Sequence, residues 1–421
     1  MFLTRSWHHL VLLAWLALWV AIFRHHGGHS WHYFATGSRS LLCLPHADEP
    51  ARCGLHVYAV HPELQIGPLS LLLAGVVTTW QHNDGVGVAE VFMALAGWAV
   101  LLVLERDARR ETPQPLQDLL RRRVLLAGLV FLPVWTNLAV RFAHLDDVLA
   151  LLCTTAALYA LTRCRPTATG LALALATLAK PWAIAFLPLV LALPRGRRLA
   201  LCWAVLPVVG AAALFLLADP HTLTAARFAI PNVASSSLRT LGVSDPNTPG
   251  WDRPAQFGLG MALAALAVHR SRWRAVVMVA SAVRIMLDPS VYSYYTAGIL
   301  LGAVVWDIHA RRGRVIPAWS WLTFGALFAC RYLQLPDAVL GATRLTVCLV
   351  IICCALWLPP TLGWFWPWQP SPAPARLPDS ERRAIRRSSQ AEVAEDVPDT
   401  PITADGLRCD PGHRRKARDR E

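Results

Sequence analysis

Apolar runs of bilayer-spanning length recur from the start of the chain almost to residue 358. Residues 86–104, 124–140 and 338–358 are clear examples, and each matches the run of about 17–25 apolar residues that a transmembrane helix requires. Hydrophobic residues make up 55% of the 421, and the mean hydropathy is +0.40. We therefore predict an all-α, polytopic membrane protein with about 11–13 transmembrane or half-spanning helices.

The net charge is +13, and many of the arginines behind it cluster in short loops between apolar runs. The clusters lie at residues 105–123, 163–165, 195–198, 270–274 and 311–314. Such clusters mark the cytoplasmic side of a membrane protein, so we expect no nucleic-acid partner. A cytoplasmic 105–123 loop places residues 144–147 outside. The orientation of the N-terminus stays open: either residues 66–80 do not fully cross, or the N-terminus is external.

We divide the chain into a membrane domain, residues 1–366, and a disordered cytoplasmic tail, residues 367–421, which is rich in Pro, Arg and acids. The membrane domain carries two predicted external loops, at 24–65 and 218–256. The expected location is the plasma membrane, which the chain crosses many times, with membrane lipids as partners.

The loop at 24–65 collects polar side chains that membrane spanning does not require. Cys43 and Cys53 lie in it, close enough in sequence to form a disulfide if the loop faces an oxidising compartment. It also holds seven histidines, at positions 25, 26, 29, 32, 46, 56 and 61. No pair of them has strong metal-ligand spacing on a predicted helix, so we predict no metal site here; a divalent metal is the alternative.

The stretch Arg141-Phe-Ala-His-Leu-Asp-Asp147 lies between two apolar runs. Asp146 and Asp147 stand where the second run begins as a helix. Carboxylates stabilise helix N-termini, so capping alone is one explanation for them. A cap needs only one of the two acids, and the alternative is that the pair belongs to a functional site.

Residues 168–194 contain Lys180, one of only two lysines in the chain, followed directly by Pro181. Basic clusters flank this segment at both ends and Pro breaks a helix, so we predict two half-helices that dip into the membrane and return. A single tilted span is the alternative. A lone Lys in an apolar segment costs about 2.5–3.5 kcal/mol, so it needs an anion, either a carboxylate or the phosphate of a lipid-linked ligand.

Arg284 and Asp288 form a second charged group, at the end of the apolar run 275–287. They are four residues apart and share one helical face, so an intrahelical ion pair is the simplest explanation. The alternative is that the arginine belongs to a functional site.

Three stretches resemble a family of actinobacterial integral membrane glycosyltransferases of the GT-C type, mannosyltransferase-like enzymes that use polyprenol-phosphate sugars. They are residues 31–42 leading to 55–68, residues 170–182, which include Lys180-Pro181-Trp182, and residues 141–147. The similarity extends over most of residues 1–310. The three stretches together, in this order and spacing, are more specific than any one alone.

The resemblance implies a GT-C-like fold and inverting transfer of a sugar from a polyprenyl-phosphate donor to an acceptor at the outer face of the plasma membrane. It also implies a catalytic acid in the first external loop and a second acidic motif at the next external turns. Family members usually place an Asp shortly after the first span, where this chain has residues 29–33 without an acid. The candidates for the catalytic base are then Glu63, His32, Asp146 and Asp147.

The chemistry requires a base within hydrogen-bond reach of the attacking hydroxyl and a cation at the leaving phosphate. Lys180, with Arg141 or Arg284, is the candidate phosphate-binding group. A transporter or flippase is the main alternative function, but it favours ionisable residues at the bilayer midplane and internal repeats. The chain shows no repeat and places most ionisable residues near the membrane faces. A non-catalytic membrane protein is the third alternative.

Overall fold

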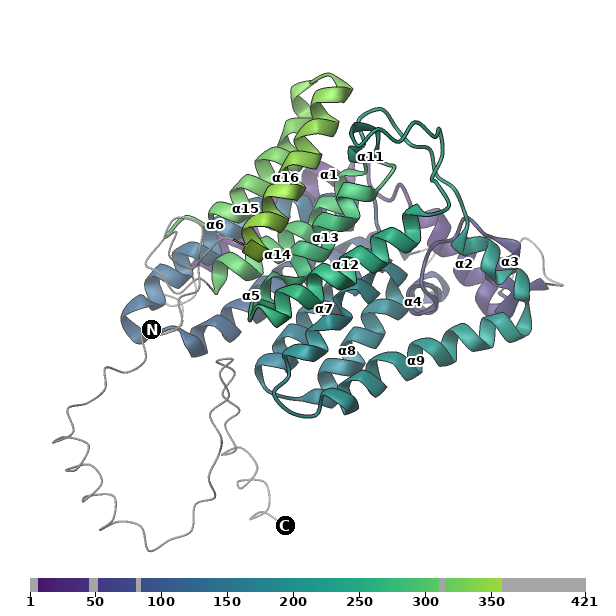
Figure 1. Cartoon of the computed structure of the whole chain (residues 1–421), viewed down its shortest axis with the longest axis horizontal. Helices are drawn as coiled ribbons and strands as arrows, with labels where there is room; N and C mark the ends of the chain where they lie inside the picture. The colour runs from purple at the N-terminus through teal and green to yellow at the C-terminus, as the bar shows by residue number, and fades with distance from the viewer. Residues whose placement is uncertain (1–6, 45–51, 81–84, 310–314, 358–421) are drawn as a thin grey trace, which may run out of the picture.

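The computed structural model describes residues 7–44, 52–80, 85–309 and 315–357 (Figure 1). These residues form helices joined by turns, and the described part of the chain contains no strand beyond an isolated bridge between Pro231 and Asn247. The predicted all-α class is therefore confirmed. The predicted tail, residues 367–421, lies outside the described residues.

Six helices in the described residues are long and apolar enough to cross a membrane. They are α1 (Trp7–Arg24), α5 (Val86–Glu111), α6 (Gln117–Thr136) with its extension η6 (Asn137–Arg141), α7 (Leu145–Thr162), α9 (Arg197–Ala218) and α16 (Asp337–Trp357). Four shorter apolar segments accompany them: α4 (Pro68–Trp80), α8 (Pro166–Ala179), η7 (Pro181–Ala192) and α14 (Thr296–Ile308). This composition confirms the predicted polytopic membrane protein.

The remaining elements are shorter or less apolar than the spans, or connect them. They are α2 (Trp31–Leu42), η3 (Gly54–His56), α3 (Val57–Val60), η5 (Gln114–Leu116), η8 (Pro220–Thr222), α10 (Leu223–Ala226), α11 (Ser237–Thr240), α12 (Asp252–His269), η9 (Trp273–Ala275), α13 (Val276–Leu287), η10 (Ser293–Tyr295), α15 (Ala318–Thr323), η11 (Phe324–Phe328) and η12 (Ala329–Leu333). The buried centre is formed by α13, in which every residue except Arg284 is buried, and α14, in which every residue is buried. Gly302 of α14 allows the close approach of these two helices, because a Cβ there would lie 2.3 Å from the Met278 backbone nitrogen.

The predicted Arg-rich loop at 105–123 is largely helical, which corrects the sequence prediction. Helix α5 continues to Glu111 and α6 begins at Gln117. Charged side chains are tolerated in these helices because they find partners elsewhere in the fold. Asp107 accepts a hydrogen bond from Thr162 Oγ1 at 2.7 Å, and Arg123 Nη1 donates to the Asp307 carbonyl at 3.2 Å.

The segment around Lys180 forms a helical hairpin, as predicted. Helix α8 ends at Ala179, Lys180 is extended with φ −144° and ψ 115°, and the 3₁₀ segment η7 begins at Pro181. The two far ends meet, because a Cβ on Gly196 would lie 2.8 Å from Pro166 Cγ. The alternative of one long tilted span is therefore wrong. Helix α9 then runs beside α8 along the edge of the molecule (Figure 1).

The start of α4 is attached to the hinge of this hairpin. The backbone N–H of Gly67 donates to the Ala179 carbonyl at 3.0 Å, and Ser70 Oγ donates to the same oxygen at 3.1 Å. A Cβ on Gly67 would lie only 2.0 Å from the Leu178 carbonyl oxygen, so only glycine permits this approach.

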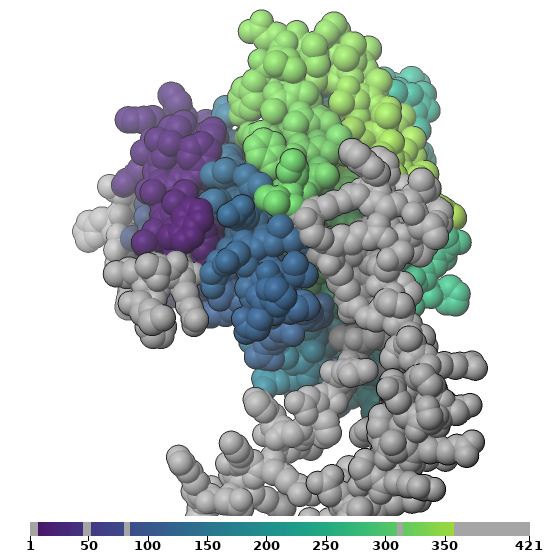
Figure 2. Space-filling view, turned by 90° about the vertical axis from the view of Figure 1, so that its left-hand side faces the viewer, coloured from purple at the N-terminus to yellow at the C-terminus, as the bar shows by residue number. Residues whose placement is uncertain are grey.

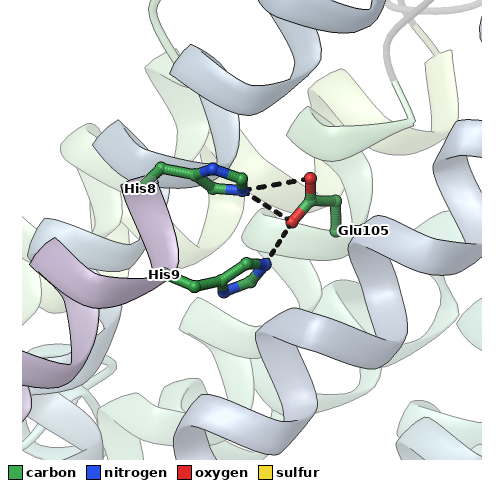
Figure 3. A group of neighbouring side chains, drawn as sticks. All are labelled: His8, His9 and Glu105. Atoms are coloured by element: carbon green, nitrogen blue, oxygen red, sulfur yellow. Dashed lines mark hydrogen bonds and ion pairs between the residues drawn. The ribbon is translucent and has the colours of Figure 1, made fainter. Parts of the chain in front are cut away.

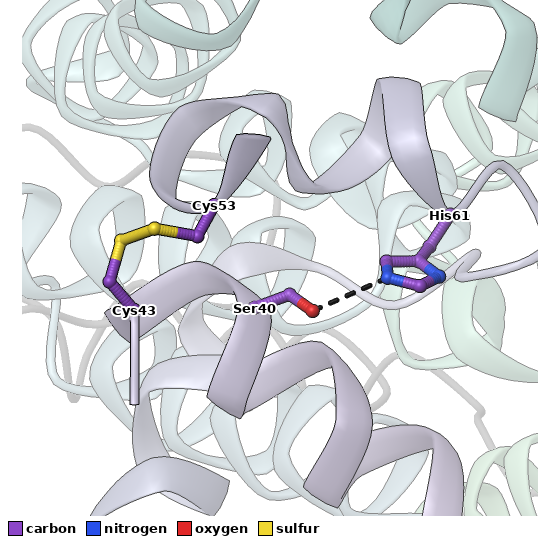
Figure 4. The surroundings of a disulfide bond; sticks show 4 residues. All are labelled: Ser40, Cys43, Cys53 and His61. Atoms are coloured by element: carbon purple, nitrogen blue, oxygen red, sulfur yellow. Dashed lines mark hydrogen bonds between the residues drawn. A yellow bond between two sulfur atoms is a disulfide. The ribbon is translucent and has the colours of Figure 1, made fainter. Parts of the chain in front are cut away.

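The disulfide considered from the sequence is present between Cys43 and Cys53, with a Cα–Cα distance of 5.3 Å (Figure 4). It connects the end of α2 to the residue before η3. Beside it, Ser40 of α2 forms a hydrogen bond with His61 at 3.3 Å. These contacts fix α3 relative to α2, and Tyr58 of α3 in turn donates to the Ile66 carbonyl at 2.7 Å.

Candidate functional site: a charged cluster beside an apolar cavity

The turn between α6 and α7 presents the two adjacent acids. Helix α6 widens into the π-helical η6, and Ala143 follows with a left-handed φ of 51°. The chain then turns at His144, whose backbone N–H donates to the Leu138 carbonyl at 3.2 Å. This irregular backbone lets α7 begin at Leu145 with Asp146 and Asp147 in its first turn.

Asp146 is fully buried, and both of its carboxylate oxygens accept hydrogen bonds. Its Oδ1 accepts the backbone N–H of Asp147 at 2.8 Å within the first turn of α7, whose N-cap residue is His144 and has no side-chain cap. His144 Nδ1 lies 3.3 Å from the same oxygen. The ammonium of Lys180, carried by the hinge of the hairpin, donates to Oδ2. The carboxylate that a lone membrane lysine requires is therefore Asp146.

Asp147 has a different environment, which capping does not explain. Its Oδ1 accepts the indole N–H of Trp182 at 2.9 Å and lies 3.4 Å from Arg284 Nη1. Its Oδ2 is buried and has no hydrogen-bond partner among the described residues. Lys180 Nζ and His144 Nδ1 each lie 3.8 Å from Oδ2. Asp147 Oδ2 can therefore accept a further hydrogen bond, and it lies in a positively charged environment.

Arg284 is held by aromatic rings as well as by charge. Its guanidinium lies 4.3 Å from the ring centroids of both Trp182 and Tyr295. Such stacking fixes the plane of the guanidinium and suits Arg better than Lys. The predicted intrahelical ion pair with Asp288 is wrong: Arg284 pairs with Asp147, while Asp288 accepts the Ser290 backbone N–H at 2.9 Å.

A cavity of about 420 Å³ adjoins this charged cluster of Asp146, Asp147, Lys180 and Arg284. Lys180 and Arg284 line it together with a third cation, Arg253 of α12. None of the described residues that line the cavity is an acid. Most of its wall is apolar and comes from α9, α10 and the hinge of the hairpin. The cavity thus combines a cationic end with a hydrocarbon-like wall.

Arg253 differs from the other two cations because it forms no direct ion pair in the described structure, although Asp252 and Asp288 are close enough to interact with it electrostatically. Its Nε and Nη2 atoms are buried without a hydrogen-bond partner. Sequence analysis missed Arg253 because it lies in the predicted loop 218–256, whereas the structure begins α12 at Asp252. Buried donors without acceptors are costly, so Arg253 is suited to receive an anion from the cavity.

The structure brings together four of the seven candidate residues: Asp146, Asp147, Lys180 and Arg284. The other three lie elsewhere. His32 is exposed beside Tyr33, Glu63 is 38% exposed and pairs with His61 at 3.2 Å, and the Arg141 guanidinium lies 5.8 Å from the Phe142 ring centroid. In the part of the chain that the structure describes, none of these three contacts the Asp pair or lines the cavity.

Two groups of described residues place at least three metal-ligating side chains together: His144 with Asp146 and Asp147, and His8 with His9 and Glu105. In the first group the Lys180 ammonium already occupies Asp146. A metal there would compete with that cation, so the first group favours a hydrogen-bonded ionic cluster.

No family model, curated protein or solved structure matches the chain. The fold itself defines a polytopic α-helical membrane protein. Within it, a buried charged cluster lies beside an amphipathic cavity.

Proposed function

We propose that this protein transfers a sugar from a polyprenyl-phosphate donor to a hydroxyl acceptor. The observation that carries the proposal is the lining of the cavity: three cations, no acid among the described lining residues, and mostly apolar walls. A lipid phosphate has the matching chemistry, with an anionic head group and a long hydrocarbon chain. The resemblance of residues 31–68, 141–147 and 170–182 to polyprenol-phosphate-dependent glycosyltransferases supports the same ligand.

Arg253 is the residue best placed to contact the donor phosphate, because two of its buried nitrogens lack partners in the described structure. Lys180 and Arg284 line the same cavity while their charges are balanced by Asp146 and Asp147. Together they supply the positive potential that stabilises a leaving phosphate. Before the donor binds, the Lys180–Asp146 and Arg284–Asp147 pairs prevent Lys180 and Arg284 from being buried as unpaired charges, which would destabilise the protein.

Asp147 is the proposed general base. In the reaction, the acceptor oxygen forms a bond to the anomeric carbon as the bond from that carbon to the phosphate oxygen breaks. The electron pair of the broken bond stays on the phosphate, and the hydroxyl proton moves to Asp147 Oδ2. Asp147 lies behind the lining residues Lys180, Trp182 and Arg284, so the acceptor hydroxyl has to enter between them to reach this oxygen. This oxygen has free acceptor capacity, whereas Asp146 is fully engaged. A single displacement of this kind inverts the anomeric configuration.

The proposed location is the outer face of the plasma membrane. Cys43 and Cys53 are bonded as in proteins that face an oxidising compartment. Tyr58, five residues after Cys53, lines the cavity, so the segment that carries the disulfide also contributes to the cavity wall. A donor in the outer leaflet would reach the cavity between α9 and the hairpin.

The test is a transfer assay with membranes that contain the full-length protein and a radiolabelled polyprenyl-phosphate sugar. The expected result is loss of label from the lipid and its appearance in a product, with Asp147→Asn inactive. Intact donor in all preparations would overturn the proposal. If the labelled lipid instead moves between leaflets without losing its sugar, the protein is a flippase and the transferase proposal is wrong.

A further inference from the structure

We propose that His8, His9 and Glu105 form a binding site for one divalent transition-metal ion of the zinc class. The group is separate from the charged cluster. It lies at the beginning of α1 and in the last part of α5, next to the junction with α6 (Figure 3). The Asp146–Asp147 turn follows the opposite end of α6, a helix of 20 residues and therefore about 30 Å long.

The three side chains converge on one point. His8 Nε2 lies 2.9 Å from Glu105 Oε2, and His9 Nε2 lies 2.6 Å from the same oxygen (Figure 3). Neighbouring residues on a helix normally point in directions about 100° apart. Here the two imidazole centroids are only 4.3 Å apart, so both rings turn toward the carboxylate. All three ligand atoms lie within 4.8 Å of one another.

The donor set identifies the class of ion. Two imidazole nitrogens and one carboxylate oxygen are ligands of zinc, cobalt and copper, whereas calcium and magnesium prefer oxygen alone. Three protein ligands leave a fourth tetrahedral position for water. Ligand atoms around tetrahedral zinc are about 3.3 Å apart. When a metal replaces the bridging protons, the His8 and His9 nitrogens, now 2.9 and 2.6 Å from Glu105 Oε2, therefore need to withdraw by about 0.4 and 0.7 Å.

Arg109 orients the carboxylate of Glu105 for metal binding. Its Nε and Nη2 atoms donate to Glu105 Oε1 at 2.9 and 2.5 Å. His8 Nε2 also lies 3.1 Å from Oε1, but Oε2 is the oxygen nearer to both histidines. Such outer contacts orient the ligands of metal sites. All three residues are buried, and the His9 side chain, at 10% exposed, is the most accessible of them.

The rings make no competing polar contact within the described residues. The Nδ1 atoms of both His8 and His9 are buried without a hydrogen-bond partner there, so Nε2 is the polar contact of each ring. A bound metal would join the first span to α5. Figure 2 shows this part of the surface, where the N-terminal residues in purple lie beside the blue residues of α5 and α6.

The experiment uses purified full-length protein that has been treated with a chelator and then dialysed against zinc or cobalt. Metal content is measured by mass spectrometry, and the visible absorption of bound cobalt reports tetrahedral coordination. We expect one zinc per chain. His9→Gln and Glu105→Gln should each lower zinc affinity by at least about 100-fold, because loss of an outer contact alone typically costs 10–100-fold.

His269→Gln, which alters an exposed histidine of α12, is the matched control and should keep full metal content. Circular dichroism checks that each variant is folded, and Gln at position 105 keeps an acceptor for both histidines. Less than stoichiometric zinc in the wild-type protein, or unchanged zinc affinity in folded His9→Gln, would overturn the site. Neither result depends on the sugar-transfer assay.

Discussion

The guanidinium of Arg284 lies 3.4 Å from Asp147 Oδ1, between the rings of Trp182 and Tyr295. This contact joins α13 to α7 and to the hairpin that carries Lys180. With the Lys180–Asp146 pair it forms a buried arrangement of two cations and two anions. The arrangement balances its own charge, and within it Asp147 Oδ2 has no hydrogen-bond partner in the described structure. In the adjoining cavity, two nitrogens of Arg253 also lack one there.

Removing the Lys180 charge should destabilise the protein. Lys180→Met leaves the fully buried Asp146 carboxylate without its cation, and breaking a buried pair typically costs about 3–5 kcal/mol. Thermal unfolding in detergent measures the effect. The double variant Lys180→Met/Asp146→Leu should recover much of the loss, because it removes both charges. A melting temperature of Lys180→Met equal to wild type would contradict the assigned pair.

Asp147→Asn should abolish sugar transfer, since it removes the proposed base. Loss of a general base typically reduces a rate by about 10²–10⁴-fold. Glu63→Gln is the control: this acid is 38% exposed and lies outside the charged cluster, so the rate should stay near wild type. Initial rates with a fixed polyprenyl-phosphate sugar give the comparison. Full activity of Asp147→Asn would return Asp147 to a structural role.

Gly67→Ala should weaken the contact between α4 and the hinge at Lys180. The added Cβ would lie 2.0 Å from a backbone oxygen that cannot move aside alone. Overpacking of this kind costs about 1–3 kcal/mol. Gly258→Ala is the matched control, because a Cβ there meets no atom within 4 Å and alanine favours a helix. Equal melting temperatures of Gly67→Ala and wild type would contradict the close approach.

Asp219, just after α9, should produce an acid-sensitive contribution to stability. The backbone N–H of His221, followed by the side chain of His56, lowers the pKa of Asp219 to about 2. A lowered folded-state pKa stabilises the protein above the unfolded value of about 3.9, and this contribution disappears as the pH falls through the folded value. The melting temperatures of wild type and Asp219→Asn should therefore differ at pH 7 and converge between about pH 4 and 2. Parallel curves would contradict this assignment.

Local sequence rules predicted the elements that depend on local chemistry. Pro181 and the flanking basic clusters indicated the hairpin, and alternating apolar and polar stretches indicated the spans. The rules wrongly predicted a loop at residues 105–123. A charged stretch is typical of a loop, and the buried partners that let these residues be helical are far away in sequence. Glu105 and His8 are 97 positions apart, and only the packing of α1 on α5 brings them together.

The candidate site was predictable in part for the same reason. A lone membrane lysine requires an anion, but the choice of Asp146, 34 positions away, depends on how the hinge packs against α7. Nothing in the sequence indicated a functional role for Arg253, because arginines are common in loops. Its importance comes from its place in the cavity and from its unsatisfied nitrogens.

The most direct measurement compares the affinity of purified full-length protein for a polyprenyl phosphate and for the uncharged polyprenol of equal length. We expect the phosphate to bind more tightly, and Arg253→Gln to lose about 10–100-fold, the value of a hydrogen bond to a charged group. Arg141→Gln, outside the cavity lining, should retain wild-type affinity. Equal affinity for phosphate and alcohol, or an Arg253→Gln variant that binds like wild type, would contradict a lipid-phosphate site in this cavity.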